Sequence, residues 1–596
     1  MPSVPFRIPL AYARGSEGSF LSRDRNEAVV RNNAGHPTRA HRNFAWAGVP
    51  VIRLLFLTTF VTNALGQLYN PGPQVLTFFS DVDDSDQPYA IYLPKNLDRS
   101  KRYPLVISLH GAWSNHRLNL RRVFGRGNLP GESDPEASRY FPQFRDVPFV
   151  VASPLARGTM GYTGIAEKDV YDVLSDVKRR FPIDDDRVYL TGLSMGGGGT
   201  LWLGLTRPDV WAALAPVCPA APEGAAELAG NAVGIPIRMF QGDADPVARP
   251  EDTRRWHKLL REAGANIEYV EYPGVRHNSW DRAYKDAAIF DWFAQHKRNR
   301  WPVRVRFSTR EYAHTSAYWL NIDALTPGRL ATIDARFTGP NAISVTTSDI
   351  DGFTLALTGH PSWVRRRPLV VTVDGKPLHI SAVETISFSK TRNGWTRGRC
   401  QFGFDEKRPG LAGPISDAIT ARHLYVYGTT GNPTADELRA RREHAQQAAE
   451  WSTPGNRLLL NLRVIADREV HESDLHTANL VLFGNKDTNA LIARMRLPIE
   501  LNAGAADFGL IMVLPFGDRL AIVNSGLPWW TRADQARRVG LPFVPVPFRA
   551  LQSFEDFILF RGGLDDVVAE GRFDRRWRLP ADAARLMSAT GAVTIR

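Results

Sequence analysis

Short apolar runs alternate with segments of helical periodicity between residues 88 and 296. In residues 166–181 the apolar side chains recur every three or four positions, which is typical of an amphipathic helix. The apolar runs between such segments are short and continuous, as in strands that are buried on both faces. Strands of this kind, alternating with helices, predict a mostly parallel sheet in an α/β domain over residues 67–299. The runs are residues 89–94, 103–109, 147–153, 187–192, 214–218, 235–240 and 267–272.

A different pattern begins after residue 300. Residues 302–390 contain several short runs in which apolar and polar residues alternate, separated by turn-forming residues. This alternation predicts a small antiparallel β-sandwich, which we place at residues 300–395.

The α/β rhythm returns from about residue 415. Residues 434–450 have the pattern of a capped helix, and residues 458–465 and several later runs have the pattern of strands. We therefore expect a second, smaller α/β domain over residues 396–596.

Residues 1–66 differ from the rest of the chain. The first 50 residues are polar and rich in arginine, and a short apolar core at residues 54–61 and the small-residue motif Ala64-Leu65-Gly66 follow them. This order is that of a secretory signal peptide cleaved before Gln67, preceded by an N-terminal extension. We expect the true start near residue 49 or 51, and export to the periplasm or the cell exterior. The apolar core is too short for stable membrane insertion; a buried strand or a membrane anchor are the alternatives.

A serine motif follows one of the predicted strands. Residues 192–196 read Gly-Leu-Ser-Met-Gly, which matches G-x-S-x-G, and a predicted helix begins directly after Ser194. Glycines on both sides allow a sharp turn, so that the serine hydroxyl stands clear at the carboxyl end of the strand. Ser194 is therefore the candidate nucleophile, and a helix N-cap is its alternative role.

The partners that a nucleophilic serine needs lie at other strand ends. Asp243 and Asp245 follow the run 235–240, and His277 follows the run 267–272, which gives the chain order serine, acid, histidine. We prefer Asp245 as the acid because it stands in an Asp-Pro-Val sequence, while Asp243 remains the alternative. His257 and His296 compete with His277, but neither follows a predicted strand.

The loop after the run 103–109 supplies the remaining part of such a site. It reads His110-Gly-Ala-Trp113, and backbone N–H groups from Ala112 or Trp113, together with that of Met195, are expected to form an oxyanion hole. We expect His110 to hold this loop in place rather than to react.

Composition narrows the chemistry further. With 43% apolar and 23% charged residues, the chain has the composition of an ordinary globular protein. The net charge is +12, but no dense basic tract is present, so we expect no nucleic-acid partner.

Cys218 and Cys400 are too few for a disulfide framework or a cysteine-based metal site. Residues 81–86 lack the glycine and glutamate of a calcium loop, and residues 471–476 fit no metal-ligand spacing; we expect no metal and no cofactor.

Residues 88–297 resemble the α/β-hydrolase group that spans feruloyl and acetyl-xylan esterases, polyhydroxybutyrate depolymerase-like esterases and the prolyl-oligopeptidase catalytic domain. The similar stretches are residues 109–112, 185–197, 242–247 and 277–280. The resemblance implies a secreted serine hydrolase that forms an acyl-enzyme on Ser194, with Asp245 as the acid and His277 as the base. It also implies that residues 300–596 are accessory regions.

The resemblance leaves the substrate open. We expect a carboxylic ester, and acyl groups linked to a polysaccharide are among the candidate substrates. A serine peptidase of the prolyl-oligopeptidase family acting on short peptides is the alternative, although the chain has no room for an N-terminal propeller before the hydrolase. A binding protein on a decayed hydrolase scaffold is a third alternative. The sequence does not fix the oligomeric state.

Overall fold

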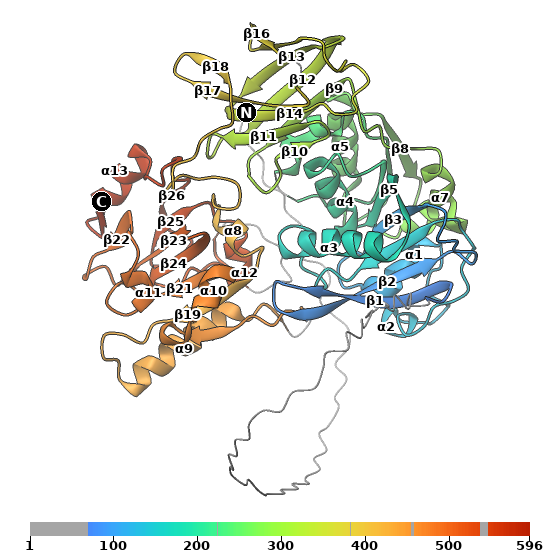
Figure 1. The fold of residues 1–596 in the computed structure, drawn as a ribbon. Coiled ribbons are helices and arrows are strands. Elements are labelled where there is room, and N and C mark those ends of the chain that lie inside the picture. The colour runs from blue at the N-terminus through green and yellow to red at the C-terminus, as the bar shows by residue number, and fades with distance from the viewer. Residues whose placement is uncertain (1–68, 223, 382, 454–457, 537–545) are drawn as a thin grey trace, which may run out of the picture. The chain divides into compact units, whose positions relative to one another are not determined.

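The computed structural model describes residues 69–222, 224–381, 383–453, 458–536 and 546–596 (Figure 1). Residues Asn70–Arg596 form one compact unit. The expected signal peptide at residues 51–66 lies outside the described residues. Within the described ranges, no helix is both long and apolar enough to cross a membrane.

The first part of the unit is built on an eight-stranded sheet with the strand order β1-β2-β4-β3-β5-β6-β7-β8. β1 and β4 pair antiparallel to β2, and the pairs from β4 to β8 are parallel. The strands are β1 (Gly72–Ser80), β2 (Ser85–Leu93), β3 (Tyr103–Leu109), β4 (Val150–Pro154), β5 (Ile183–Leu193), β6 (Ala213–Val217), β7 (Ile237–Gly242) and β8 (Ile267–Tyr272). The helices are α1 (His116–Val123), α2 (Asp134–Ala137), α3 (Ile165–Arg180), α4 (Met195–Thr206), α5 (Pro250–Glu262), α6 (Trp280–Ala283), α7 (Ala288–Phe293) and the 3₁₀ helices η1 (Ala225–Ala232) and η2 (Lys285–Ala287).

Burial follows the apolar pattern of the sequence. All seven residues of β3 are buried, as expected for a central parallel strand covered on both faces. In α3 the side chains of Val170, Val173, Leu174 and Val177, spaced three or four residues apart, are buried. This part of the chain therefore has the expected α/β-hydrolase-like architecture.

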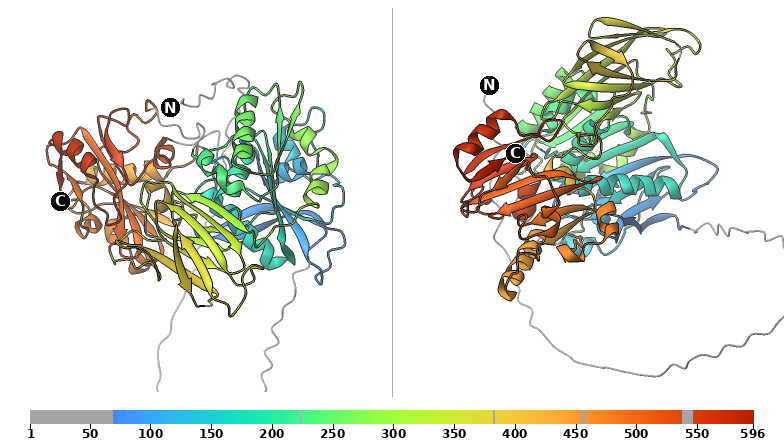
Figure 2. Two further views of the ribbon diagram at one scale, coloured as in Figure 1. Left: turned by 90° about the horizontal axis from the view of Figure 1, so that it is seen from above. Right: turned by 60° about the vertical axis from the view of Figure 1, so that its left-hand side comes forward.

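The next part contains two five-stranded sheets, of order β10-β11-β14-β17-β18 and β16-β15-β13-β12-β9 (Figure 2). Side chains from both sheets contribute to one hydrophobic core, among them Phe307, Trp319 and Phe353. The strands are β9 (Arg304–Thr309), β10 (Ser316–Ala317), β11 (Leu320–Leu325), β12 (Ala331–Gly339), β13 (Ala342–Ser348), β14 (Ile350–Ala356), β15 (Leu369–Val373), β16 (Lys376–Ile380), β17 (Thr385–Thr391) and β18 (Gly394–Arg397).

One pairing in these sheets differs from the expected antiparallel arrangement. β13 and β15 are parallel, whereas the other pairs of the two sheets are antiparallel. The reason is that β14, which lies between them in the sequence, belongs to the other sheet. The chain crosses over and back, and so it returns to the first sheet in its original direction.

A buried side chain links this part to the first part of the unit. Asn231 at the end of η1 donates through Nδ2 to the carbonyl oxygens of Leu205 and Ser308, each at 2.9 Å. Its Oδ1 accepts the N–H of Ser308 in β9 at 2.7 Å. The hydrogen-bonding capacity of one buried amide is thus shared between α4 and β9.

The last part contains a seven-stranded sheet of order β20-β19-β21-β24-β23-β25-β26, and β22 pairs with β27. The pairs from β20 to β24 are parallel, and the remaining pairs are antiparallel. Its strands are β19 (His423–Tyr427), β20 (Val464–Ala466), β21 (Asn479–Phe483), β22 (Ile499–Leu501), β23 (Phe508–Phe516), β24 (Arg519–Gly526), β25 (Phe557–Arg561), β26 (Val567–Gly571) and β27 (Val593–Ile595). Its helices are α8 (Ile415–Ala418), α9 (Ala435–Ala449), α10 (Glu472–Thr477), α11 (Ala490–Ala493), α12 (Val546–Leu551), α13 (Ala581–Ala589) and the 3₁₀ helix η3 (Asp467–Glu469).

Two predicted elements of this part have different outcomes. Thr434 caps α9 and forms a capping box with Glu437, in agreement with the predicted helix. The strand expected over residues 458–465 was wrong in extent, because only Val464–Ala466 pairs as β20. The backbone before it contacts the first part of the unit instead: the carbonyl of Leu459 accepts from Arg157, and the N–H of Asn461 donates to Asp83.

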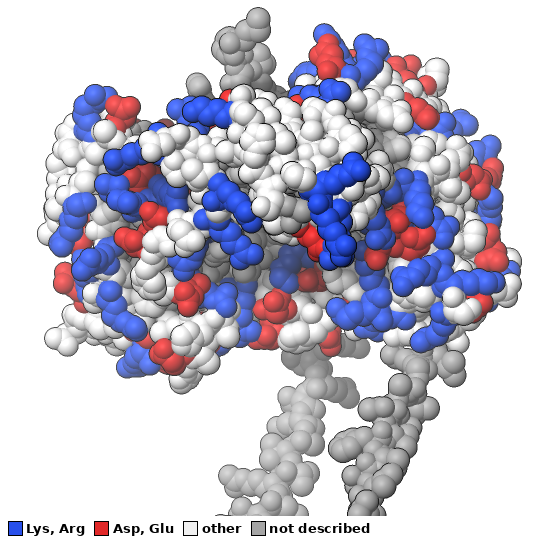
Figure 3. Space-filling model, turned by 45° about the horizontal axis from the view of Figure 1, so that its top comes forward, with Lys and Arg blue, Asp and Glu red and all other residues white. Residues whose placement is uncertain are grey.

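Charged side chains of both signs are interspersed on the face of the molecule drawn in Figure 3. Many arginines take part in ion pairs, for example Arg304 with Asp334 and Arg310 with Glu227. Pairing of this kind offsets part of the excess of basic residues locally.

Candidate active site

Ser194 lies on a sharp turn between β5 and α4. Its φ and ψ angles are 55° and −117°, a strained conformation for a residue with a side chain. The turn is possible because neighbouring positions are glycines: a Cβ on Gly196 would lie 2.3 Å from the carbonyl oxygen of Leu109. A Cβ on Gly192 would likewise lie 2.3 Å from the carbonyl oxygen of Gly196. The G-x-S-x-G spacing is thus required by close backbone contacts around the serine.

Three predicted site residues meet at the carboxyl ends of the strands. The Oγ atom of Ser194 lies 3.0 Å from Nε2 of His277, and Nδ1 of His277 lies 2.8 Å from Oδ2 of Asp245. The three side chains form a continuous hydrogen-bonded chain, in which each contact has the length of a normal hydrogen bond.

The structure distinguishes between the two candidate carboxylates. The side chain of Asp245 is buried, and its Oδ1 accepts the N–H groups of Val247 and Ala248 at 2.8 and 3.0 Å. Asp243 instead accepts the N–H of Gly274 at 2.6 Å, in the turn after β8. Asp245 therefore faces His277, whereas Asp243 holds the loop that carries His277.

The competing histidines lie elsewhere. The ring of His257, on α5, stacks on Tyr269 at a centroid distance of 5.2 Å. The ring of His296 packs edge-on against Trp292 at 4.6 Å. Neither histidine joins the hydrogen-bonded chain of Ser194, so His277 stands as the candidate base.

The loop after β3 lies directly against the serine. A Cβ on Gly111 would lie 3.4 Å from Cβ of Ser194, which places Ala112 beside the serine turn. Met195 is the first residue of α4, so its N–H has no acceptor within the helix. The N–H of Trp113, by contrast, donates to Oγ1 of Thr159 at 2.8 Å. Of the expected oxyanion donors, Trp113 would have to break this hydrogen bond before its N–H could bind the oxyanion.

His110 is buried beneath the loop. Its Nε2 lies 2.8 Å from the carbonyl oxygen of Leu155, and its own carbonyl accepts the hydroxyl of Tyr162 at 3.1 Å. Burial lowers the pKa of His110, which favours the neutral imidazole. These contacts agree with a role in holding the loop.

Sequence reasoning missed two polar side chains at the site. Gln241, buried at the end of β7, donates to Oδ2 of Asp245 at 3.2 Å and accepts the hydroxyl of Thr253 at 2.8 Å. The only sequence signal for Gln241 was a polar residue at the end of an apolar strand. Thr159, the partner of Trp113, gave no signal, because its loop has no motif.

A metal ion does not fit the one compact group of possible ligands in the described part of the chain. Cys218, Asp245 and His277 offer ligand atoms within 4.8 Å of one another. Both ring nitrogens of His277 already have partners, and burial raises the pKa of Cys218 to about 12, so its thiol stays protonated. This donor set is therefore unsuited to bind a cation.

Part of the chain is similar to known esterases. The Esterase family model, described as "Putative esterase", matches residues 82–330. Among solved structures, a thermostable esterase is 26% identical over 38% of this chain and 63% of that chain, with a TM-score of 0.31. A ferulic acid esterase is 20% identical over 38% of this chain and 99% of that chain, with a TM-score of 0.31.

A third solved structure is a ferulic acid esterase from the anaerobic fungus Anaeromyces mucronatus, 17% identical over 39% of this chain and 92% of that chain, with a TM-score of 0.29. The family match extends beyond residue 299, where we placed the end of the hydrolase, and includes β9, β10 and β11. Residues 82–330 thus match the Esterase family model, and they contain most of the α/β-hydrolase-like sheet described above.

Proposed function

We propose that the protein is a serine hydrolase that cleaves carboxylic esters through an acyl-enzyme on Ser194. The observation that carries the proposal is the hydrogen-bonded chain from Ser194 through His277 to the buried Asp245. The esterase family match to residues 82–330 supports the same reaction class.

In the first half-reaction, Oγ of Ser194 attacks the ester carbonyl carbon while Nε2 of His277 takes the serine proton. The carbonyl π electrons move to oxygen, and the tetrahedral intermediate then expels the alcohol. The leaving oxygen receives the proton from His277, and the acyl group remains on Ser194. In the second half-reaction, water attacks the acyl-enzyme, His277 takes a water proton, and the acid is released as Ser194 recovers its proton.

The surrounding groups stabilise charge during these steps. The carboxylate of Asp245 orients His277 through Nδ1 and offsets the positive charge that develops on the ring. The N–H of Met195, with that of Ala112 or Trp113, stabilises the negative oxygen of the intermediate. No step requires a cofactor.

We further propose an exported enzyme that acts on ester groups attached to a larger molecule, such as polysaccharide-linked acyl groups. The signal-peptide pattern at residues 51–66 supports export. In this proposal, residues 300–395 form a β-sandwich accessory domain and residues 396–596 a second, α/β accessory domain. Both are supported by the separate sheets that these regions build.

The test compares the chain from Gln67 with its Ser194→Ala variant. Both would be assayed with p-nitrophenyl acetate, methyl ferulate and a proline p-nitroanilide peptide, and labelled with a fluorophosphonate. Ester cleavage and labelling that depend on Ser194 are expected. Cleavage of the anilide alone would transfer the protein to the serine peptidases, and absence of labelling would favour a binding protein on a hydrolase scaffold.

A further inference from the structure

A cavity of about 500 Å³ lies beside the serine loop. Trp113 and Thr159, which line it, are joined by a hydrogen bond, and a Cβ built on Gly111, two residues before Trp113, would lie 3.4 Å from Cβ of Ser194. The cavity therefore lies beside the loop that reaches the nucleophile, and its volume is in the size range of small-molecule sites. Its lining includes Trp113, His116, Arg117, Arg157, Thr159 and Leu459.

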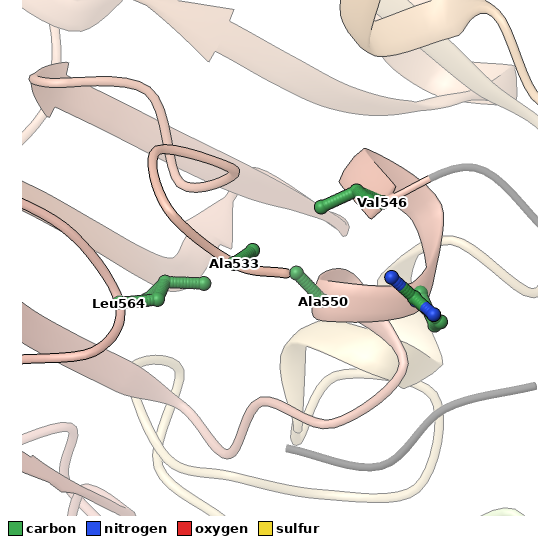
Figure 4. Close-up of a pocket in the computed structure, with 5 residues that line it drawn as sticks. Ala533, Val546, Ala550 and Leu564 are labelled. Carbon is green, nitrogen blue, oxygen red and sulfur yellow. The ribbon is translucent and has the colours of Figure 1, made fainter. Parts of the chain in front are cut away.

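Another cavity, near the carboxyl end of the chain, is far smaller (Figure 4). It is lined by Ala533, Val546, Ala550, Leu564 and Arg549 and holds about 10 Å³, which is room for about one water molecule. It cannot accept a substrate group.

One wall of the larger cavity comes from a distant part of the chain. Leu459 is a lining residue, although it lies about 300 residues from the other lining residues and belongs to the third part of the fold. Its side chain is an unusual surface group, because Leu459 is a large apolar residue that is 39% exposed. An apolar side chain left open at the wall of a cavity is suited to contact a bound ligand.

Arg157 fixes Leu459 at this place. The guanidinium of Arg157 is completely buried and pairs with Asp83 at 2.8 Å and with Asp169 at 2.7 Å. Its Nη1 also donates to the carbonyl oxygen of Leu459 at 2.8 Å. Oδ2 of Asp83 accepts the N–H of Asn461 at 2.9 Å, so two backbone groups of this segment are bound to one buried ion cluster. The acidic turn at residues 81–86 thus serves as an attachment point for the segment.

The charged groups of the lining have partners within the protein. The charge of Arg157 is offset by its two carboxylates, and the guanidinium of Arg117 donates to the carbonyl oxygens of Ser138 and Arg139. Burial lowers the pKa of His116 to about 3, so its imidazole is neutral. The size of the cavity and its apolar walls are therefore the features that select a ligand.

We propose that this cavity is a substrate pocket beside the loop that reaches Ser194, that it takes a ring-sized apolar group of the ester, and that Leu459 determines its size. The inference rests on the proposed ester hydrolysis for its kinetic test but not for its binding test. It assigns a role in substrate selection to the third part of the fold.

The test uses Leu459→Trp, which would fill the pocket. The matched control is Leu586→Trp in α13, another exposed apolar residue (51%) far from it in the chain. Two aromatic esters distinguish the acyl side from the alcohol side: ethyl benzoate and benzyl acetate, with ethyl acetate as the small reference. Binding of the unreacted esters would be measured by saturation-transfer NMR in a Ser194→Ala background, and kcat/KM in the active enzyme.

We expect Leu459→Trp to weaken the binding of one aromatic ester at least tenfold, and to lower kcat/KM for the same ester by a similar factor. Ethyl acetate should change less than twofold, and Leu586→Trp should change nothing.

Unchanged binding of both aromatic esters, or an equal loss for all three esters, would overturn the pocket assignment. Failure of the proposed function looks different: the wild type would cleave no ester, whereas Leu459-dependent binding in the Ser194→Ala background would persist.

Discussion

Oδ2 of Asp245 lies 2.8 Å from Nδ1 of His277, and the carboxylate that makes this contact is buried. Asp243, only two residues earlier, is turned toward the N–H of Gly274. The two aspartates are thus chemically alike but structurally distinct, and their exchange for asparagine separates their roles.

Asp245→Asn should lower kcat for an ester by about 10³- to 10⁴-fold, because an amide favours the wrong tautomer of His277. Asp243→Asn, which keeps a side-chain oxygen for Gly274, should lower kcat less than tenfold. Steady-state kinetics with p-nitrophenyl acetate would measure both. The opposite ranking would mean that Asp243 is the acid.

Gly196→Ala should destabilise the protein and abolish activity. The added methyl would lie 2.3 Å from the carbonyl oxygen of Leu109, so the serine turn would have to move, at a cost of about 1–3 kcal/mol or more. Gly339→Ala is the control, since nothing lies within 4 Å of its added Cβ. Chemical denaturation and ester turnover would be measured together; equal stability of the two variants would contradict the close contact.

Asp169, a partner of Arg157, should stabilise the folded protein less as the pH rises, which is the opposite of the usual behaviour of a paired carboxylate. Burial raises the pKa of Asp169 to about 6, despite its pairing with Arg157. In the folded protein Asp169 then binds its proton more tightly than in the unfolded chain. Its contribution to the free energy of unfolding is therefore greatest at low pH and is lost as the pH rises from about 4 to 6.

The measurement compares the wild type with Asp169→Asn. The difference in the free energy of unfolding, wild type minus variant, should decrease between pH 4 and pH 6 and stay constant above pH 7. Asp172→Asn, in the same helix and half-exposed, serves as the control. An increase over this interval would show that pairing with Arg157 outweighs burial.

Cys218 should resist alkylation in the folded protein. Its thiol is buried, and burial raises its pKa to about 12, so very little thiolate exists at pH 8. Iodoacetamide at pH 8 should leave Cys218 unmodified and ester turnover unchanged, whereas labelling in guanidinium chloride should be complete. Mass spectrometry of proteolytic peptides would measure the labelling of Cys218. Rapid native labelling of Cys218 would contradict its burial.

The sequence was informative where function depends on local order. Ser194, Asp245 and His277 each follow a strand of one parallel sheet, and such strands end at a common edge. The position of each residue relative to its strand therefore predicted that the three would meet. The preference for Asp245 over Asp243 rested on a three-residue context, and the burial of Asp245 supplies its physical reason.

The sequence was uninformative where contacts join distant segments. Residues 458–465 have the pattern of a strand, but Leu459 and Asn461 bond to Arg157 and Asp83, about 300 residues away. No local pattern shows that the backbone will find partners outside its own sheet. Thr159 was missed for the same reason, since its importance comes only from the N–H of Trp113.

The buried amide of Asn231 limits where the chain can be divided. A chain cut at residue 299, where the apolar rhythm changes, would lose both groups of Ser308 that Asn231 binds. The amide of Asn231 would then be left without its partners in β9. The smallest unit that keeps these contacts thus includes β9 and the strands that cover it, and the family match to residue 330 spans the first of these. A gene fusion designed at residue 299 would transplant an incomplete module.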